Sequence, residues 1–146
     1  MALHAEAILS DTGPLARRLD GFEFRPQQLQ MAQLVEDNLE RKGRLMVEAG
    51  TGVGKSFAYL VPAVLFAARS KKKAIICTYT INLQEQLVEK DLPLLKRVLP
   101  VDFAYAMLKG RSNYLCTYRM TRLVTQRTLD GIATPDPLLM CPDWRV

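Results

Sequence analysis

Nine residues from Glu48 to Ser56 carry the clearest chemistry in this 146-residue chain. They read Glu-Ala-Gly-Thr-Gly-Val-Gly-Lys-Ser, after the apolar run 45–47 and before the apolar segment 57–68. Alternating glycines let a backbone curl so that successive N–H groups point at an anion, and a helix that begins there adds the positive end of its dipole. A strand, a glycine-rich loop and a helix in this order predict a phosphate-binding loop rather than an ordinary glycine turn.

The residue types in this loop indicate separate tasks. Lys55 is expected to reach the β- and γ-phosphates of a nucleotide, and the Ser56 hydroxyl is expected to hold Mg²⁺, so these two are the predicted catalytic residues. The rest of the predicted nucleotide site consists of Ala49, Gly50, Thr51, Gly52, Val53 and Gly54. Alanine at position 49 departs from the strict pattern, in which a glycine begins the loop.

Apolar runs and helical segments alternate along the chain. Residues 26–41 and 57–68 have the apolar spacing of helices, and Pro26 suits a first helical turn. Short apolar runs at 45–47, 74–78 and 101–108 indicate buried strands. The sequence therefore predicts an α/β fold, a parallel sheet flanked by helices, with the loop at the carboxyl end of its strand.

The composition is that of a folded globular domain, with 49% hydrophobic and 24% charged residues. A net charge of +5 is compatible with a polyanionic partner, although basic residues also simply solvate a surface. The sequence has no apolar run of membrane-spanning length, no secretory signal and no disulfide framework among its three cysteines. We therefore expect a cytoplasmic protein with no membrane partner.

Two polar groups flank the loop in sequence. Gln28, upstream, has an amide that can both donate and accept, which suits the edge of adenine; the alternative is a plain surface helix residue. Residues 78–87 follow a predicted strand and open a helix, where hydroxyls and N–H groups bind phosphates well; the alternative is a helix that Thr80 merely caps.

The segment 109–116 combines basic residues, an aromatic and the thiol of Cys116. A lone cysteine is more often a small buried hydrophobe than a ligand, and Cys77 fits that description because it falls in a predicted buried strand. Cys116 follows a polar loop, so a ligand role is more open there. Cys141, before a proline, is ambiguous between the two roles.

These motifs together resemble superfamily 2 helicases of the iron–sulfur branch that includes DinG and XPD, with bacterial DinG-like members most similar. The loop from Ala49 to Ser56 resembles motif I, Arg25 to Gln28 the Q motif, Thr78 to Leu87 motif Ia, and Lys109 to Cys116 the segment with the first iron–sulfur cysteine. All four occur in the order of that family.

The resemblance implies an ATP-dependent DNA helicase that moves 5′→3′ on single-stranded or forked DNA and has a RecA-like P-loop NTPase fold. It implies that Gln28 reads the adenine of ATP and that Cys116 is one ligand of a 4Fe–4S cluster. The residues implied to contact DNA are Thr78, Thr80, Asn82 and Gln84. The implied domains are an N-terminal extension at 1–20, the first part of the ATP-binding domain at 21–115 and the start of the iron–sulfur insertion at 116–146.

The chain departs from the family pattern after these motifs. It contains no Asp-Glu-x-His sequence to supply a carboxylate for Mg²⁺ and a base for water, and no second motor domain with an arginine finger. Cys116 and Cys141 make at most two of four cluster ligands. We therefore expect an incomplete motor domain, with the remaining helicase domains missing. The alternatives are a nucleotide- or DNA-binding module without turnover and a small P-loop kinase.

Overall fold

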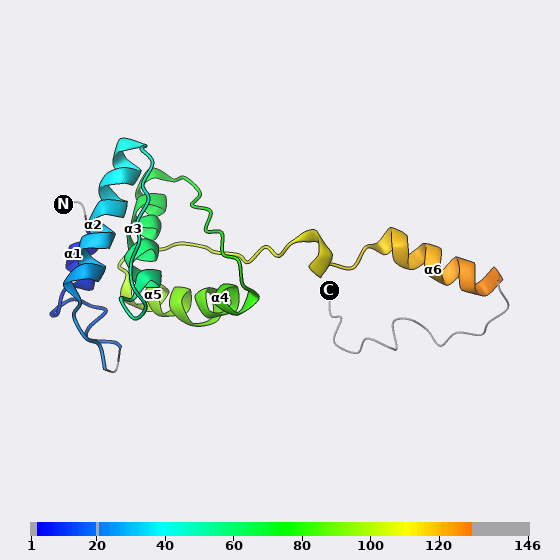
Figure 1. Cartoon of the computed structure of the whole chain (residues 1–146), viewed down its shortest axis with the longest axis horizontal. Helices are drawn as coiled ribbons and strands as arrows, with labels where there is room; N and C mark the ends of the chain where they lie inside the picture. Colours follow the sequence, from blue (N-terminus) through cyan, green and yellow to red (C-terminus); the bar gives the residue numbers. More distant parts are fainter. Residues whose placement is uncertain (1–2, 20, 130–146) are drawn as a thin grey trace. The chain divides into compact units, whose positions relative to one another are not determined.

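The computed structural model describes residues 3–19 and 21–129 (Figure 1). The chain divides into two compact units, Met1–Met107 and Leu108–Val146. The domain boundaries expected from the sequence, after residues 20 and 115, stay predictions.

Helices dominate the described part of the first unit. They are α1 (Ala5–Leu9), α2 (Pro26–Arg41), α3 (Lys55–Ser70), α4 (Ile81–Gln86), the π-helix η1 (Leu87–Asp91) and α5 (Leu92–Val98). The prediction of a helix over 26–41 is confirmed. Pro26 occupies its first turn, where a missing N–H costs nothing, and Lys42 ends it in the left-handed conformation with its N–H bonded to Asn38 O.

The helical segment from α4 to α5 contains an unusual turn. The residues of η1 have αR neighbours on both sides, so the backbone stays helical from Ile81 to Val98. Pro93 has no N–H to donate to the preceding turn, and the N–H of Leu92 bonds to Leu87 O, five residues back. The wider π-turn thus accommodates the proline without ending the helix.

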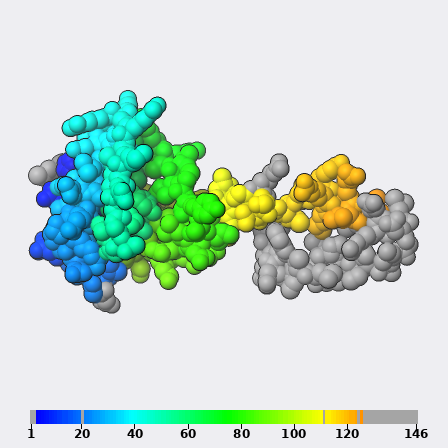
Figure 2. Space-filling view, in the orientation of Figure 1, coloured from blue at the N-terminus to red at the C-terminus, as the bar shows by residue number. Residues whose placement is uncertain are grey.

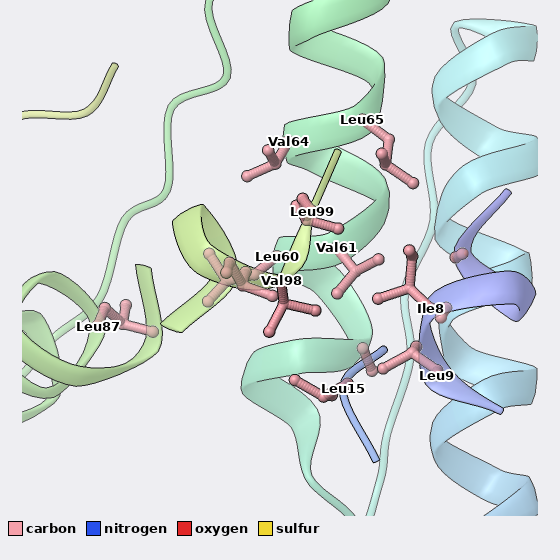
Figure 3. Packing of buried hydrophobic residues seen from close by; sticks show 14 residues of the cluster. Ile8, Leu9, Leu15, Leu60, Val61, Val64, Leu65, Leu87, Val98 and Leu99 are labelled. Carbon is pink, nitrogen blue, oxygen red and sulfur yellow. The ribbon is translucent and has the colours of Figure 1, made fainter. Parts of the chain in front are cut away.

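The hydrophobic core lies where α1, α2, α3 and α5 meet (Figure 3). Its fully buried members include Ile8 and Leu9 from α1, Ala32 from α2, Leu60 and Val61 from α3, and Leu95 from α5. Helix α2 packs along α3, and α1 contacts both (Figure 1). Burial of these side chains is what fixes α3, and the glycine-rich loop precedes that helix directly.

The predicted parallel sheet is wrong: none of the described residues forms a strand. The segments 45–47, 74–78 and 101–108 are irregular, and no backbone hydrogen bond joins one of them to another. A strand requires such pairing for its N–H and C=O groups. Burial is missing as well, because Met46 is 97% and Ile75 86% exposed. In the space-filling view the cyan atoms of residues 40–50 lie on the surface of the first unit (Figure 2).

The described part of the second unit contains a short 3₁₀ turn and one longer helix. These are η2 (Arg111–Asn113) and α6 (Thr117–Leu129). The backbone N–H of Lys109 donates to Tyr114 Oη at 2.9 Å, and Asn113 Nδ2 donates to Gly110 O at 3.2 Å. The polar loop that precedes Cys116 is therefore closed by its own side chains. Across residues 3–19 and 21–129, no helix combines the length and the apolar character needed to cross a membrane.

Candidate functional site

The glycine-rich loop leads directly into the N-terminus of α3. Gly52 and Gly54 both have a φ of 81°, a conformation that L side chains adopt at a cost, and Gly54 is the residue that caps α3. The first hydrogen bond of the helix runs from Ala58 N to Gly54 O at 3.3 Å. The N–H groups ahead of that bond have no partner within the helix and are free to bind an anion at its positive end.

The Lys55 ammonium lies across the loop. Its Nζ donates to Ala49 O at 2.9 Å and to Gly50 O at 2.7 Å, and the side chain is exposed. An ammonium has three donors, so these two bonds hold the charge beside the loop backbone while leaving it accessible to solvent. A phosphate group at the loop would meet a positive charge that is already close to it.

Gln28 is buried against the loop from the side of α2. It is only 4% exposed, and its Nε2 donates to Gly54 O at 2.8 Å. A Cβ at position 54 would collide with that same Nε2 and lie 3.0 Å from Gln28 Cδ, so any side chain there would require the Gln28 amide to move from its place against the loop. The structure thus rules out a plain surface role for Gln28. Whether it also reads adenine stays a prediction.

The sequence analysis did not single out two polar residues of the first unit, Tyr59 on α3 and Asp91 on η1. Tyr59 is half-buried, and burial raises the pKa of its phenol, as does the charge of Asp91, while a hydrogen bond with the Ser56 side chain lowers it. Asp91 is 7% exposed, and burial raises the pKa of its carboxyl against the opposing effects of a Gln86 hydrogen bond and the Lys90 charge. No local sequence pattern indicates that the charge of an aspartate on η1 acts on a tyrosine of α3, although these two helices are in contact.

The segment predicted to contact DNA begins α4. Thr80 Oγ1 accepts a hydrogen bond from Leu83 N at 3.3 Å, so the hydroxyl caps this helix, as the alternative reading of the sequence proposed. Thr78 and Gln84 are partly exposed and Asn82 is exposed. The structure therefore leaves these side chains accessible, and their contact with DNA stays a prediction.

The cysteines do not assemble a metal site in the described residues. Cys77 is exposed, against the expectation that it lies in a buried strand, and Cys116 is exposed just before α6. Within residues 3–19 and 21–129, no three His, Cys, Asp or Glu side chains are placed to hold a metal ion. Cys141 lies outside the described residues. A 4Fe–4S cluster needs four ligands, so Cys116 as placed here does not fit one by itself.

The sequence matches the DEAD/DEAH box helicase family over residues 25–129. The match covers the loop, Gln28, the segment 78–87 and Cys116, and extends over more than half of the chain. The chain therefore belongs to the DEAD/DEAH box helicase family, and the resemblance to helicases stated above is confirmed.

Curated relatives of the chain carry DinG and YoaA names. The chain is 45% identical over 122 residues to the ATP-dependent DNA helicase YoaA of Haemophilus influenzae, which covers 84% of the chain and 18% of that protein. It is 48% identical over 127 residues to the ATP-dependent DNA helicase YoaA of Escherichia coli, covering 87% and 19% respectively. It is 38% identical over 128 residues to the 3′-5′ exonuclease DinG of Bacillus subtilis, covering 86% and 14%.

The chain thus spans less than a fifth of the length of these relatives. The family is one of enzymes, and two of these relatives are named as ATP-dependent helicases.

Proposed function

We propose that these residues form the ATP-binding front part of an ATP-dependent DNA helicase. The observation that carries the proposal is the construction of the loop at Gly54. Two glycines at a φ of 81° turn the chain into α3, Lys55 begins that helix, and the buried amide of Gln28 supports the turn from α2. A family match that includes all of these residues supports the same proposal.

In this proposal the loop residues divide the work of holding Mg²⁺ and ATP. The N–H groups between Ala49 and Ser56 surround the phosphates, and the Lys55 ammonium moves from the carbonyls of Ala49 and Gly50 to the β- and γ-phosphate oxygens. The Ser56 hydroxyl would be a ligand of Mg²⁺, and the ion would neutralise charge on the phosphates.

The loop fits such an anion in this structure. A Cβ built at Gly50 or Gly52 meets no atom within 4 Å, so space is open beside these glycines. Lys55 is exposed and needs to break only two hydrogen bonds to its own backbone in order to reach a phosphate. Charge-assisted bonds to phosphate are stronger than bonds between an ammonium and neutral carbonyls, so the exchange is favourable.

The proposed DNA contacts come from the segment that opens α4. Thr78, Thr80, Asn82 and Gln84 would hydrogen-bond the phosphate backbone of single-stranded or forked DNA, and a net charge of +5 favours such a partner. Translocation in the 5′→3′ direction follows from the resemblance to the DinG/XPD branch. Relatives named as DNA helicases support DNA as the partner and a cytoplasmic location.

We also propose that Cys116 is one ligand of a 4Fe–4S cluster in a longer protein. Its exposed thiol at the start of α6 is accessible to a metal. Soft thiolates are the preferred ligands of such clusters. The 146 residues contain three cysteines, so the remaining ligands would have to come from outside them.

Labelled ATP binding tests the nucleotide site. Lys55→Ala removes the charge that faces the phosphates, and we expect ATP affinity to fall at least about tenfold, the loss expected for a charge-assisted contact. Lys72→Ala, at an exposed lysine beyond the end of α3, is the matched control and should bind as the parent does. Equal ATP affinity for the parent and Lys55→Ala would show that the site is assigned wrongly.

A second candidate function is nucleotide and DNA binding without turnover by residues 1–146 taken alone. The observation that favours it is the lack of an Asp-Glu-x-His sequence in these residues. The phosphate loop supplies binding, whereas hydrolysis also needs a carboxylate that orients Mg²⁺ and water.

A further inference from the structure

The net positive charge of this chain comes from one short stretch. Five of the 20 basic residues and none of the 15 acidic residues lie between Leu108 and Leu129, so the rest of the chain contains 15 of each. This stretch therefore accounts for the whole net charge of +5. The segment 78–87, to which the proposed function assigns DNA contacts, contains Glu85 and no basic residue. The charge that attracts a polyanion thus lies in the second unit, outside the segment 78–87.

Helix α6, drawn in orange in Figure 1, presents part of this charge on one side of its surface. Residues three and four apart on a helix are neighbours, which joins Tyr118 to Arg122, Arg122 to Arg119, and Arg119 to Leu123. All four side chains are exposed, Tyr118 by 68% and Leu123 by 62%. We call these four residues the α6 stripe. It alternates guanidinium groups with an aromatic and an aliphatic side chain.

The polar groups of the α6 stripe are not used within the part of the chain that the structure describes. Arg119 and Arg122 take part in none of its ion pairs, and Tyr118 takes part in none of its hydrogen bonds or ring contacts. Tyr114, the other tyrosine of this stretch, is already engaged, because its Oη accepts the Lys109 N–H. Two guanidinium groups and one ring are therefore available to a partner.

This combination of groups fits single-stranded nucleic acid. A guanidinium donates two parallel hydrogen bonds to a phosphate, and an aromatic ring stacks on any base whose face is accessible. In a duplex the faces of the bases are covered by their neighbours, so the ring would have no stacking partner there. A helix that lies on a membrane keeps its apolar residues apart from its charges, whereas the α6 stripe mixes them.

We propose that Tyr118, Arg119 and Arg122 form a binding site for single-stranded DNA, in which Tyr118 stacks on a base and the two arginines bind phosphates. The proposal rests on the proposed function for its choice of DNA as the polyanion. It adds a site in the second unit to the contacts assigned to the segment 78–87. It also assigns the salt-dependent part of DNA affinity to α6.

The salt dependence of DNA binding tests the two arginines. The measurement is the fluorescence anisotropy of a labelled oligothymidine of about 12 nucleotides, titrated with residues 1–146 at several salt concentrations. Arg119→Gln and Arg122→Gln should each reduce the slope of log affinity against log salt by about 0.7, the value for one phosphate contact on a single strand. Arg97→Gln, at an exposed arginine of α5, is the matched control and should leave the slope unchanged. Equal reductions in all three variants would overturn the proposal, because the charge would then act without a site.

An abasic oligonucleotide of the same length tests the stacking. Tyr118→Ala should weaken binding to oligothymidine about five- to 100-fold, the loss of one base stack, while Tyr118→Phe keeps the ring and should bind within about twofold of the parent. On the abasic strand, which has phosphates but no bases, Tyr118→Ala should bind as the parent does. An equal loss on both strands would show that Tyr118 supports the helix and contacts no base.

Two further probes separate single-stranded DNA from other polyanions. A duplex of the same length should bind more weakly, and Tyr118→Ala should not change its affinity; tighter duplex binding by the parent would overturn the proposal. Vesicles with anionic phospholipids should not bind, and vesicle binding that disappears in Arg119→Gln would identify a membrane site instead. If the parent binds no oligothymidine, the α6 site is rejected, whereas ATP binding by the parent and Lys55→Ala still decides the nucleotide site.

Discussion

Gln28 and Gly54, 26 residues apart in the chain, share a hydrogen bond of 2.8 Å that fastens α2 to the start of α3. The Gly54 carbonyl oxygen also accepts from Ala58 N, so both of its lone pairs are used. A buried amide and a carbonyl saturated in this way fix the last peptide of the loop before any ligand binds. The loop is therefore preorganised from one side by α2 and from the other by α3.

The contact between Gln28 and Gly54 predicts different costs for two alanine substitutions at the same φ. Gly52→Ala should lower the free energy of unfolding by about 1–2 kcal/mol, because only the left-handed backbone opposes a side chain there. Gly54→Ala should cost about 1–3 kcal/mol more, because the new Cβ also collides with Gln28 Nε2. Urea unfolding followed by circular dichroism measures both values.

Repeating the comparison in a Gln28→Ala background provides the control. With the amide removed, the difference between Gly54→Ala and Gly52→Ala should shrink toward zero, because only the shared φ penalty is left. A difference of the same size in both backgrounds would place the cost somewhere other than Gln28.

The packing of the core predicts that alanine substitution of two leucines in the first unit lowers the free energy of unfolding by different amounts. Leu60→Ala, at a fully buried position on α3, should lower the free energy of unfolding by about 2–5 kcal/mol through lost burial and a cavity. Leu34→Ala, on α2 and 44% exposed, should change it by no more than about 0.5 kcal/mol. Comparable losses for the two variants in urea unfolding would contradict the packing described here.

Several local features could be read from the sequence because neighbouring residues determine them. Pro26 marks the start of α2, and Gly54 followed by Lys55 marks the start of α3. In each case the deciding physics is the φ preference or the missing N–H of one residue. The glycine-rich loop was located for the same reason.

The presence of a sheet could not be predicted from neighbouring residues, because the strands of a sheet pair with segments elsewhere in the chain. The run 74–78 is equally compatible with a buried strand and with an exposed connection, and only partners elsewhere in the chain decide between them. The contacts of Gln28 and Asp91 were unpredictable for a related reason. The bond between Gln28 and Gly54 joins residues far apart in sequence. The bond between Gln86 and Asp91 depends on a π-turn, which the sequence pattern does not predict.

Because the Thr80 hydroxyl caps α4, we expect two replacements of this residue to differ in their effect on the free energy of unfolding. Thr80→Ala removes the oxygen that accepts from Leu83 N and should cost about 1 kcal/mol of stability. Thr80→Ser keeps that oxygen, so its free energy of unfolding should lie within about 0.3 kcal/mol of the parent value. The measurement is the midpoint of urea unfolding, and a Thr80→Ser loss as large as that of Thr80→Ala would show that the methyl group, not the cap, stabilises this segment.

Burial of Asp91 predicts the sign of a pH effect on stability. Its pKa in the folded chain is raised above the ordinary value of 3.8, chiefly by burial, so the folded state holds the proton more tightly than the unfolded chain does. As pH falls from neutral through the raised pKa and toward 3.8, the parent should therefore gain stability relative to Asp91→Asn, which has no proton to bind there. A parent that loses stability relative to Asp91→Asn over this interval would mean that the carboxylate is favoured, not penalised, by its surroundings.

Phosphate release is the final prediction, and it concerns residues 1–146 as a separate molecule. They contain the loop for binding but no Asp-Glu-x-His sequence, so the carboxylate that would help to hold Mg²⁺ and position water is not among them. An arginine finger contributes about 10³–10⁵ in rate where one is used, and these residues include no second motor domain to supply one. We therefore expect binding without turnover. Purified residues 1–146 with Mg²⁺ and single-stranded DNA should bind ATP and release no phosphate above the rate of Lys55→Ala. DNA-stimulated release that disappears in Lys55→Ala would show instead that these residues complete the chemistry with a carboxylate of their own.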